Sequence, residues 1–518
     1  MKSTSSPRFR GVRMVPLCLL VTVALFGLMR LFAYGPSTEA SGIVAAAAGS
    51  SSTERGAIFE RARDAISRLR QHSVLDSGAV RGVEIKAASV DIKATLLSID
   101  FHITPIADLK HVISLAFQGV KVEDRSLSGA CGRTQTCAHA GNLAVLRPGD
   151  VEHSMHFGGA VRREFFDAYS QEKNSLIREV DAMVCSHPTG MCELVMPFGR
   201  PAILWATTRF EQGRERHANR FGGFVKNFRA LAALPGSAVA ANNMYDVHYV
   251  HYFTGIKPRY IPSHSGFPGV EWNWSKSKVN YKTTILVHGY RPHRDIYGGL
   301  EGFLAPLRAA TAAARVPFDF KPLRDALGGD YEYNDLASYP AILHFPYQVS
   351  IMSFFEQYRM NIPIIAPSLT LLTRWHSESL FVSERTWDTV LYNSPADKSV
   401  LPKHADADEP FDPNDEGNIE AIRWWLQWAD YYVFPHVILF DSWADLTEQL
   451  KTIDLAAVSA KMKVANVRIE KNIVNEWTDV LKQIPSRAVL EESDRVLNGM
   501  GFDDRMNHIY GKGEWAEY

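Results

Sequence analysis

Two histidines and an aspartate stand where short apolar runs of the sequence end. Asp100 and His102 lie at the end of the run Thr95–Asp100, and His187 follows the run Ala182–Ser186. Imidazole suits proton transfer at neutral pH because its ordinary pKa is about 6.5. If the runs are parallel strands, these side chains lie beyond their carboxyl ends, where open α/β sheets bind ligands. His102 and His187 are therefore candidates for acid–base chemistry, with a hydrogen-bonded structural histidine as the alternative.

Polar residues follow two further apolar runs. Arg209 and Glu211 come after Ala202–Ala206, and Asn243 comes after Ala238–Ala241. The same positional argument predicts that these side chains contact a substrate or orient a catalytic base. Arg209 and Glu211 could instead pair with each other as a structural ion pair.

The most specific pattern is the segment Ser350–Ala366, which reads SIMSFFEQYRMNIPIIA. It resembles the nucleotide-sugar-binding segment of GT-B glycosyltransferases, where a glutamate precedes a strand-opening proline by seven residues, as Glu356 precedes Pro363. The resemblance implies that Glu356 accepts hydrogen bonds from the ribose hydroxyls of the donor. An ionised acceptor makes such bonds about twice as strong as neutral ones. Ser353, near the helix N-terminus, would meet a phosphate.

The segment departs from the retaining members of the family, which usually carry another glutamate seven residues earlier. Val349 stands at that position, and Asn361 stands where glycine is usual. The missing glutamate favours an inverting enzyme. Inverting GT-B enzymes commonly have a histidine base at the end of their first strand, so the resemblance implies His102 as general base, oriented or replaced by Asp100 or Asp108. The missing glutamate leaves open a catalytically inactive GT-B-fold membrane lectin or chaperone.

The stretch after the run Ile285–Val287 looks like the first turn of a GT-B donor domain. Gly289 would let the backbone approach a diphosphate, and Arg291 and Arg294 would offset the charge of the leaving group. Exposed arginines without a ligand are the alternative. A strand that ends in His-Gly also resembles the oxyanion loop of α/β-hydrolases, but no Gly-x-Ser-x-Gly elbow follows it, which argues against that class.

These residues need a scaffold of strands and helices, and the sequence alternates between the two from about residue 90 onward. The polar stretch Glu271–Lys282 interrupts the alternation and is interpreted as a linker. We therefore predict an α/β protein of GT-B architecture, with two tandem Rossmann-like domains facing a cleft. The predicted bounds are 81–275 for the acceptor domain, 276–455 for the donor-binding domain and 456–518 for C-terminal helices that pack back.

The predicted strands and helices follow from apolar runs and helical periodicity. The strands are Thr95–Asp100, Leu143–Leu146, Ala182–Ser186, Ala202–Ala206, Ala238–Ala241, Arg259–Pro262, Thr283–Val287, Phe318–Lys321, Ala341–Phe345, Ile362–Ala366 and Val437–Phe440. Helices are predicted over Pro105–Gln118, Leu300–Arg315, Ser353–Asn361 and, most clearly, Phe165–Val180, and a long helical region is predicted from Leu446 to Lys482.

The N-terminus carries the pattern of a membrane anchor. Basic residues in 1–13 precede the apolar run Met14–Tyr34, which is long enough to span a bilayer. The positive-inside rule places 1–13 in the cytoplasm and the rest of the chain across the membrane. Residues 35–80 begin as a Ser/Ala/Gly-rich stretch and are predicted to form a stalk and stem. We predict a single-pass type II Golgi membrane protein with a luminal body; a cleaved signal peptide is the alternative.

The charge balance and the cysteines bear on partners and compartment. A formal net charge of -1 argues against nucleic acid as a partner. The pairs Cys131–Cys137 and Cys185–Cys192 are the preferred disulfides among three pairings, and they suit an oxidising compartment. Asn273 opens a glycosylation sequon, which is used only in the secretory pathway.

No spacing of cysteines and histidines indicates a metal site. Asp406 and Asp408 form an Asp-x-Asp pair like that of GT-A transferases, but they lie late in the chain in a proline-bearing loop, which favours a solvated loop. We therefore expect a metal-independent enzyme with no cofactor. It would transfer sugar from a nucleotide-diphosphate donor, a UDP-sugar by preference, to a luminal glycan or glycoprotein acceptor. An exostosin-like enzyme would fit this pattern.

Overall fold

The computed structural model describes residues 90–140, 143–170, 176–214, 217–274, 281–328, 331–386 and 398–518. All of them belong to one compact unit, Ala87–Tyr518. The predicted cytoplasmic tail, membrane anchor and stem, residues 1–80, lie outside the described residues. Within the described part of the chain, no helix has the length and hydropathy required of a membrane span.

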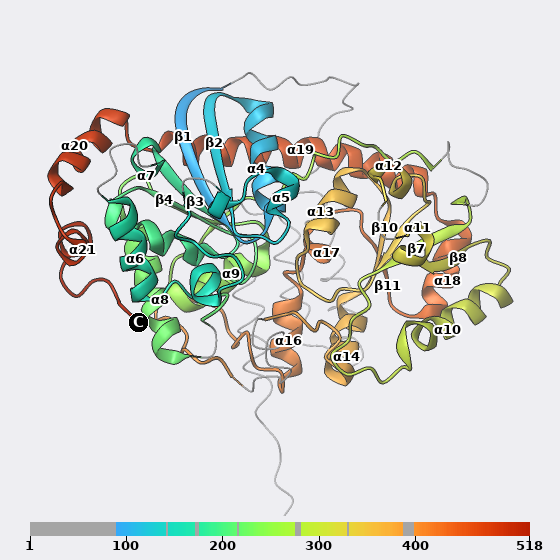
Figure 1. Cartoon of the computed structure of the whole chain (residues 1–518). Helices are drawn as coiled ribbons and strands as arrows, with labels where there is room; N and C mark the ends of the chain where they lie inside the picture. Colours follow the sequence, from blue (N-terminus) through green and yellow to red (C-terminus); the bar gives the residue numbers. More distant parts are fainter. Residues whose placement is uncertain are drawn as a thin grey trace, which may run out of the picture. The chain divides into compact units, whose positions relative to one another are not determined.

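The first half of the unit is built on a six-stranded parallel sheet, in the order β2-β1-β3-β4-β5-β6 (Figure 1). The strands are β1 Val90–Asp100, β2 Phe117–Ser126, β3 Ala182–Cys185, β4 Ala202–Ala206, β5 Ala238–Ala241 and β6 Arg259–Tyr260. The central strands β3 and β4 consist of apolar residues that are all buried. Such continuous apolar runs are expected where helices cover both faces of a parallel sheet.

Neighbouring residues of β1 face two separate cores, because side chains alternate along a strand. Leu96 packs in a cluster with residues of helices α4 (Ile103–Ala116) and α19 (Leu455–Lys482), whereas Leu97 packs in the main core on the other face. The helical segments of the first half are α4 Ile103–Ala116, α5 Cys131–Thr134, η1 Ala138–Ala140, η2 Glu152–His156, α6 Gly159–Tyr169, α7 Leu176–Glu179, η3 Thr189–Phe198, α8 Ala218–Ala233 and α9 Met244–Thr254.

The second half is built on a five-stranded parallel sheet, in the order β11-β10-β9-β7-β8. The strands are β7 Thr284–His288, β8 Asp319–Pro322, β9 Ile342–His344, β10 Ile364–Pro367 and β11 Ile438–Phe440. The helices are α10 Gly299–Ala313, α11 Leu323–Leu327, α12 Tyr333–Leu336, α13 Met352–Arg359, α14 Leu369–Ser379, α16 Ile419–Leu426, α17 Asp430–Val433 and α18 Trp443–Thr452. Two parallel α/β sheets in tandem agree with the predicted fold class.

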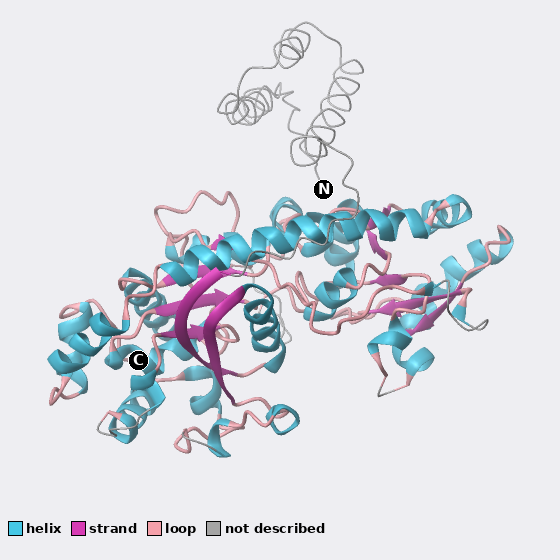
Figure 2. Ribbon diagram, turned by 90° about the horizontal axis from the view of Figure 1, so that it is seen from above, coloured by secondary structure: helices cyan, strands magenta, loops and turns pink. Residues whose placement is uncertain are grey.

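The C-terminal helices return to the first half, as predicted. The 28-residue helix α19, Leu455–Lys482, runs along both halves (Figure 2). The Asn466 side-chain amide donates to the Tyr358 carbonyl oxygen of α13 at 3.0 Å. Further along α19, Trp477 meets Trp205 of β4 edge to face at 5.3 Å. The helices α20 Arg487–Leu497 and α21 Phe502–Tyr510 then lie beside the first half (Figure 1).

Two predicted elements differ from the structure, and one strand of the structure was not predicted. The unpredicted strand is β2; it lies at the sheet edge, and its polar residues obscure the strand pattern. The run Leu143–Leu146 forms a turn whose two leucines are buried, so burial alone produced its apolar pattern. The predicted helix Phe165–Val180 corresponds to α6 and α7, with 171–175 undescribed. The predicted helical region Leu446–Lys482 comprises two helices, α18 and α19, and Asp454 caps the N-terminus of α19.

Both predicted disulfides, Cys131–Cys137 and Cys185–Cys192, are present in the structure. The first closes a short loop after β2, and the second joins the end of β3 to η3. The second disulfide therefore fixes the chain on both sides of His187.

Candidate functional site

The carboxyl edge of the first sheet brings the two predicted catalytic histidines together. Strands β1 and β3 are parallel neighbours, and the backbone N–H of Phe101 donates to the carbonyl oxygen of His187 at 2.9 Å. The rings of His102 and His187 consequently lie 5.2 Å apart, centroid to centroid. Burial lowers the pKa of both imidazoles, and the neighbouring His102 and Arg209 help to bring the pKa of His187 to about 3. Both rings are therefore neutral at neutral pH.

His102 also caps a helix. Its Nδ1 accepts a hydrogen bond from the backbone N–H of Thr104 at 3.3 Å, at the first turn of α4. In this arrangement the proton of the neutral ring lies on Nε2. Proton uptake at Nδ1 would break the cap and place a positive charge at the positive end of the helix dipole. Catalysis by His102 would therefore compete with its capping role.

The polar residues predicted after β4 and β5 form a buried network at the same edge. The Nε of Arg209 lies 3.0 Å from Oδ1 of Asp246, and the Asn243 side-chain amide donates to Oδ2 of Asp246 at 2.6 Å. Glu211 accepts a hydrogen bond from the Tyr249 hydroxyl at 2.8 Å. All five side chains are buried. Their contacts suit the positioning of other groups better than direct contact with a mobile substrate.

The network continues into the second half through residues that the sequence did not indicate. Nη1 of Arg209 donates to the carbonyl oxygen of Arg385 at 3.4 Å, and the Arg385 guanidinium lies 2.8 Å from Glu416. Although burial opposes ionisation, Arg385 and His376 together lower the pKa of Glu416 to about 2. Arg385 and Glu416 lie in loops outside the regular alternation of strands and helices, so no local signal marks them.

The predicted donor-binding helix, α13, follows β9. Its Glu356 is partly buried and accepts a hydrogen bond from the Tyr333 hydroxyl. Burial raises the pKa of Glu356 to about 7, and the like charge of Asp108, on α4 of the first half, adds to this shift. At the other end of the helix, the Ser263 hydroxyl lies 3.6 Å from the Met352 sulfur. Ser353 is in the first turn, and the helix has no side-chain N-cap. The segment therefore lies against the carboxyl end of the first sheet.

The turn after β7 requires glycine. Gly289 has a φ of +92°, and a Cβ at this position would lie 2.3 Å from the carbonyl oxygen of Phe345. This close approach brings the loops after β7 and β9 together. Arg291 is exposed and stacks over the ring of Tyr347 at 4.5 Å, and the Arg294 backbone N–H donates to the Ser379 carbonyl oxygen at 2.9 Å. The predicted phosphate-binding turn thus lies at the carboxyl edge of the second sheet.

The remaining predicted residues are Asp100, Asp108 and Asn273. Asp100 is fully buried and accepts a hydrogen bond from the Ser126 hydroxyl at 2.9 Å. Burial and the neighbouring Asp124 raise the pKa of Asp100 to about 8, so this carboxyl group is a poor candidate for a base at neutral pH. Asp108 accepts backbone N–H groups of the segment after β6 and ties α4 to it. Asn273 is partly buried, and the third sequon residue, Ser275, is outside the described residues.

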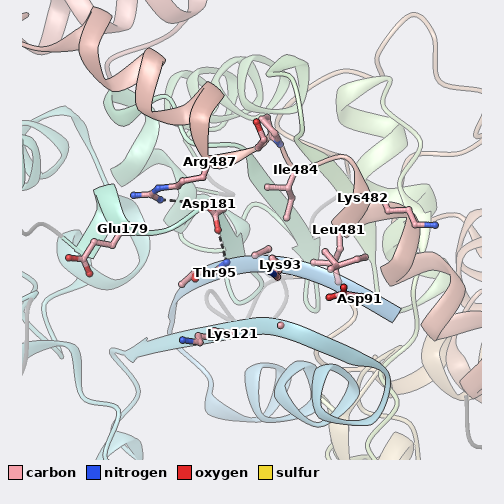
Figure 3. A pocket seen from close by; sticks show the side chains of 15 residues that line it. Asp91, Lys93, Thr95, Lys121, Glu179, Asp181, Leu481, Lys482, Ile484 and Arg487 are labelled. Atoms are coloured by element: carbon pink, nitrogen blue, oxygen red, sulfur yellow. Dashed lines mark hydrogen bonds and ion pairs between the residues drawn. The ribbon is translucent and has the colours of Figure 1, made fainter. Parts of the chain in front are cut away.

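Neither of two pockets in the described part of the chain lies at the histidine pair. The larger, about 690 Å³, is at the amino ends of β1 and β3 (Figure 3). There Asp181 accepts the Thr95 backbone N–H at 2.7 Å and pairs with Arg487. The other pocket, about 630 Å³, lies between β6, the end of α17 and α19. Because ligands of open α/β sheets bind at the carboxyl ends, the larger pocket does not belong to the candidate site.

No protein-family model matches this chain, and no curated protein sequence matches it. Among solved structures, similar chains include CalG4, the calicheamicin glycosyltransferase, at 10% identity over 76% of this chain and 100% of that chain, with a TM-score of 0.34. SnogD, a glycosyltransferase from Streptomyces nogalater, is 13% identical over 79% of this chain and 100% of its own, with a TM-score of 0.30. A glycotransferase of kitacinnamycin is 11% identical over 80% and 99%, with a TM-score of 0.29. These TM-scores are too low to assign an activity.

Proposed function

We propose that this chain is a glycosyltransferase that moves a sugar from a nucleotide-diphosphate donor, preferably a UDP-sugar, to a hydroxyl group of a luminal glycan or glycoprotein. The observation that carries the proposal is the position of the donor segment. Helix α13, with Glu356, follows a strand of the second sheet, and its Met352 contacts Ser263 of the first half. The histidine pair stands at the carboxyl edge of that first sheet.

The proposed reaction inverts the configuration of the anomeric carbon. The acceptor hydroxyl attacks that carbon, its proton passes to the imidazole of His102, and the nucleoside diphosphate leaves from the opposite face. The ring of His187 packs against that of His102 at 5.2 Å between centroids. Arg291 and Arg294, beside the turn at Gly289, offset the charge of the leaving group.

A non-catalytic sugar-binding protein is the second candidate. The position of the first glutamate of retaining enzymes is occupied by Val349, which is fully buried and supplies no carboxylate to the site. A purified full-length chain that binds a nucleotide sugar but neither transfers nor hydrolyses it would favour this candidate.

We also propose that residues 14–34 anchor the chain in the Golgi membrane, with Ala87–Tyr518 in the lumen. The basic residues before the apolar run and the two disulfides support this orientation.

The donor proposal is tested by replacing Glu356. Glu356→Ala should weaken donor binding by about 1.5–3 kcal/mol, the contribution of a hydrogen bond to a charged group. The measurement is titration of the full-length protein with a panel of nucleotide sugars and the free nucleoside diphosphate. Glu448→Gln, an exposed glutamate on α18, is the matched control and should leave affinity unchanged. Unchanged affinity in Glu356→Ala would remove the ribose-binding role.

The same residue predicts a pH dependence. The pKa of Glu356 is raised to about 7, so its carboxylate becomes ionised as the pH rises from 6 to 8. Only the ionised form accepts from both ribose hydroxyls without donating, so donor affinity should strengthen over this range. In Glu356→Gln, donor affinity should no longer change with pH through this residue.

A further inference from the structure

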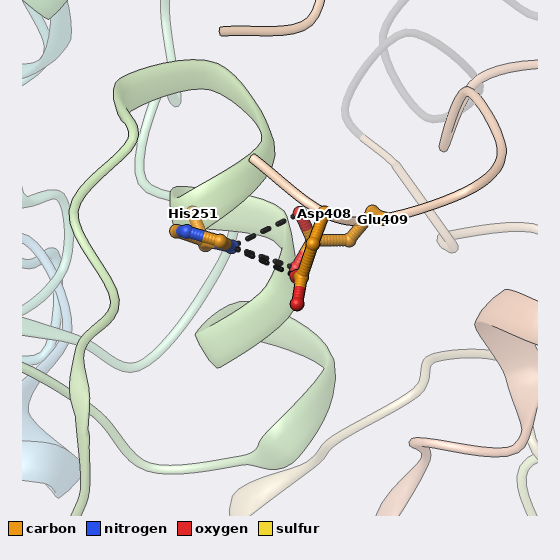
Figure 4. Close-up of side chains that lie close together, drawn as sticks. All are labelled: His251, Asp408 and Glu409. Atoms are coloured by element: carbon orange, nitrogen blue, oxygen red, sulfur yellow. Dashed lines mark hydrogen bonds and ion pairs between the residues drawn. The ribbon is translucent and has the colours of Figure 1, made fainter. Parts of the chain in front are cut away.

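A loop from the second half of the chain is docked on helix α9 of the first half. The backbone N–H of His404 donates to the Tyr252 carbonyl oxygen at 2.8 Å, which holds the loop along the helix. Two histidines three residues apart, His248 and His251, project from the same face of α9, because such residues are neighbours on a helix surface. Figure 4 shows His251 directed at the carboxylates of Asp408 and Glu409 on this loop.

The potential ligand atoms are close together. Nδ1 of His248 lies 2.9 Å from Oε1 of Glu409, and Nδ1 of His251 lies 3.0 Å from the same oxygen. Nδ1 of His251 is also 3.6 Å from Oδ1 of Asp408. Ligand atoms of a tetrahedral zinc ion, with bonds of about 2.0–2.2 Å, are about 3.3 Å apart. The ligand atoms of His251, Asp408 and Glu409 all lie within 4.8 Å of one another, so these three side chains can contact one cation, and His248 lies beside them as a partner of Glu409.

Burial and charge also suit a cation. The Glu409 side chain has no exposed surface, and an ionised carboxylate in such a position is unstable without a positive partner. One divalent cation between His251, Asp408 and Glu409 would offset the charge of both carboxylates. The ring of His248, which contacts Glu409, packs on Trp428 at 4.2 Å between centroids. The three ligands therefore come from helix α9 and from a loop that is bonded to this helix.

We propose that His251, Asp408 and Glu409 form a site for one divalent cation, with Zn²⁺ as the preferred ion and His248 as a hydrogen-bond partner of Glu409. One imidazole and two carboxylates are ligands that suit Zn²⁺, with water in the fourth position, whereas Mg²⁺ requires six oxygen ligands. The bound ion fixes the loop that leads to Glu416, the partner of Arg385 in the buried network. The sequence predicts that the loop with Asp406 and Asp408 is solvated. Asp406 is largely exposed, as this predicts, whereas the neighbouring Glu409 is buried.

The test uses the full-length protein, purified without a histidine tag and stripped of metal with a chelator. We expect the protein to take up one equivalent of Zn²⁺ after dialysis, measured by elemental analysis, and to unfold at a higher temperature than the stripped form. Asp408→Asn should weaken Zn²⁺ binding at least about tenfold, as expected for the loss of a ligand. Its side chain is 62% exposed, so this replacement spares the fold.

The matched control is Asp406→Asn, which changes an exposed carboxylate two residues away and should bind Zn²⁺ as the natural protein does. Mg²⁺ at the same concentration should not raise the unfolding temperature. The proposal is overturned if the natural protein retains no Zn²⁺. It is also overturned if both variants bind Zn²⁺ equally well, or if Mg²⁺ stabilises the protein as much as Zn²⁺ does. In any of these cases the histidines serve only as hydrogen-bond donors to Glu409.

Discussion

At the scale of single residues, His102 caps a helix and also stands at the carboxyl edge of the first sheet, where a substrate is expected to bind. Its Nδ1 caps α4 through Thr104, and its ring lies 5.2 Å from that of His187. A loss of activity on replacement could therefore follow from an unstable helix or from a missing base. The two roles are separable, because asparagine is a good helix cap but a poor base.

We predict that His102→Asn keeps the stability of the natural protein and lowers kcat by about 10²–10⁴-fold, the usual contribution of a general base. Donor binding should be almost unchanged, because the donor segment belongs to the second half. The measurements are kcat and KM for transfer, together with the unfolding temperature. Near-natural turnover in a folded His102→Asn would limit this residue to capping and make His187 the next candidate.

At the scale of elements, helix α19 contacts both halves of the unit. Its first part bonds to α13 through Asn466, and its last part fills the core of the first half with Ile473, Trp477 and Val480. The indole of Trp477 is almost fully buried and packs edge to face on Trp205. The helix therefore stabilises the first half although it follows the second half in sequence.

Trp477→Ala should lower the free energy of unfolding by about 3–5 kcal/mol, since it removes a buried aromatic side chain and leaves a cavity. Val464→Ala, an exposed position on the same helix, is the control and should change stability by less than about 0.5 kcal/mol. Chemical denaturation followed by fluorescence and circular dichroism measures both. Equal stability of the two variants would mean that the C-terminal part of α19 is not needed by the first half.

At the scale of the whole molecule, the proposed luminal orientation rests on the basic residues before the apolar run 14–34 and on two disulfides in the first half. If the body is luminal, protease added to sealed Golgi vesicles should leave Ala87–Tyr518 intact and digest it once detergent opens the membrane. An endoglycosidase should also increase the gel mobility of the chain if the sequon at Asn273 is used. Digestion in intact, sealed vesicles would contradict the luminal orientation.

The sequence by itself determined most strands of both sheets and the positions of the histidines at strand ends. β4 and β5 have the predicted bounds, because a strand buried on both faces is a continuous apolar run that local sequence displays. Pairing of Cys131 with Cys137 was likewise predictable, since close cysteines restrict the alternatives.

Tertiary structure alone decided which polar residues meet. Asp100 contacts Ser126 of a strand that was not predicted, Arg209 reaches Arg385 across 176 residues, and His251 meets Glu409 across 158 residues. Apolar periodicity indicates only that a side chain faces a core. It does not indicate which other residue that side chain contacts. The partner of a buried charge depends on strand order and on the path of loops. These are set by the packing of the entire chain, because a buried charge is tolerated only where that packing supplies an opposite charge or a hydrogen bond.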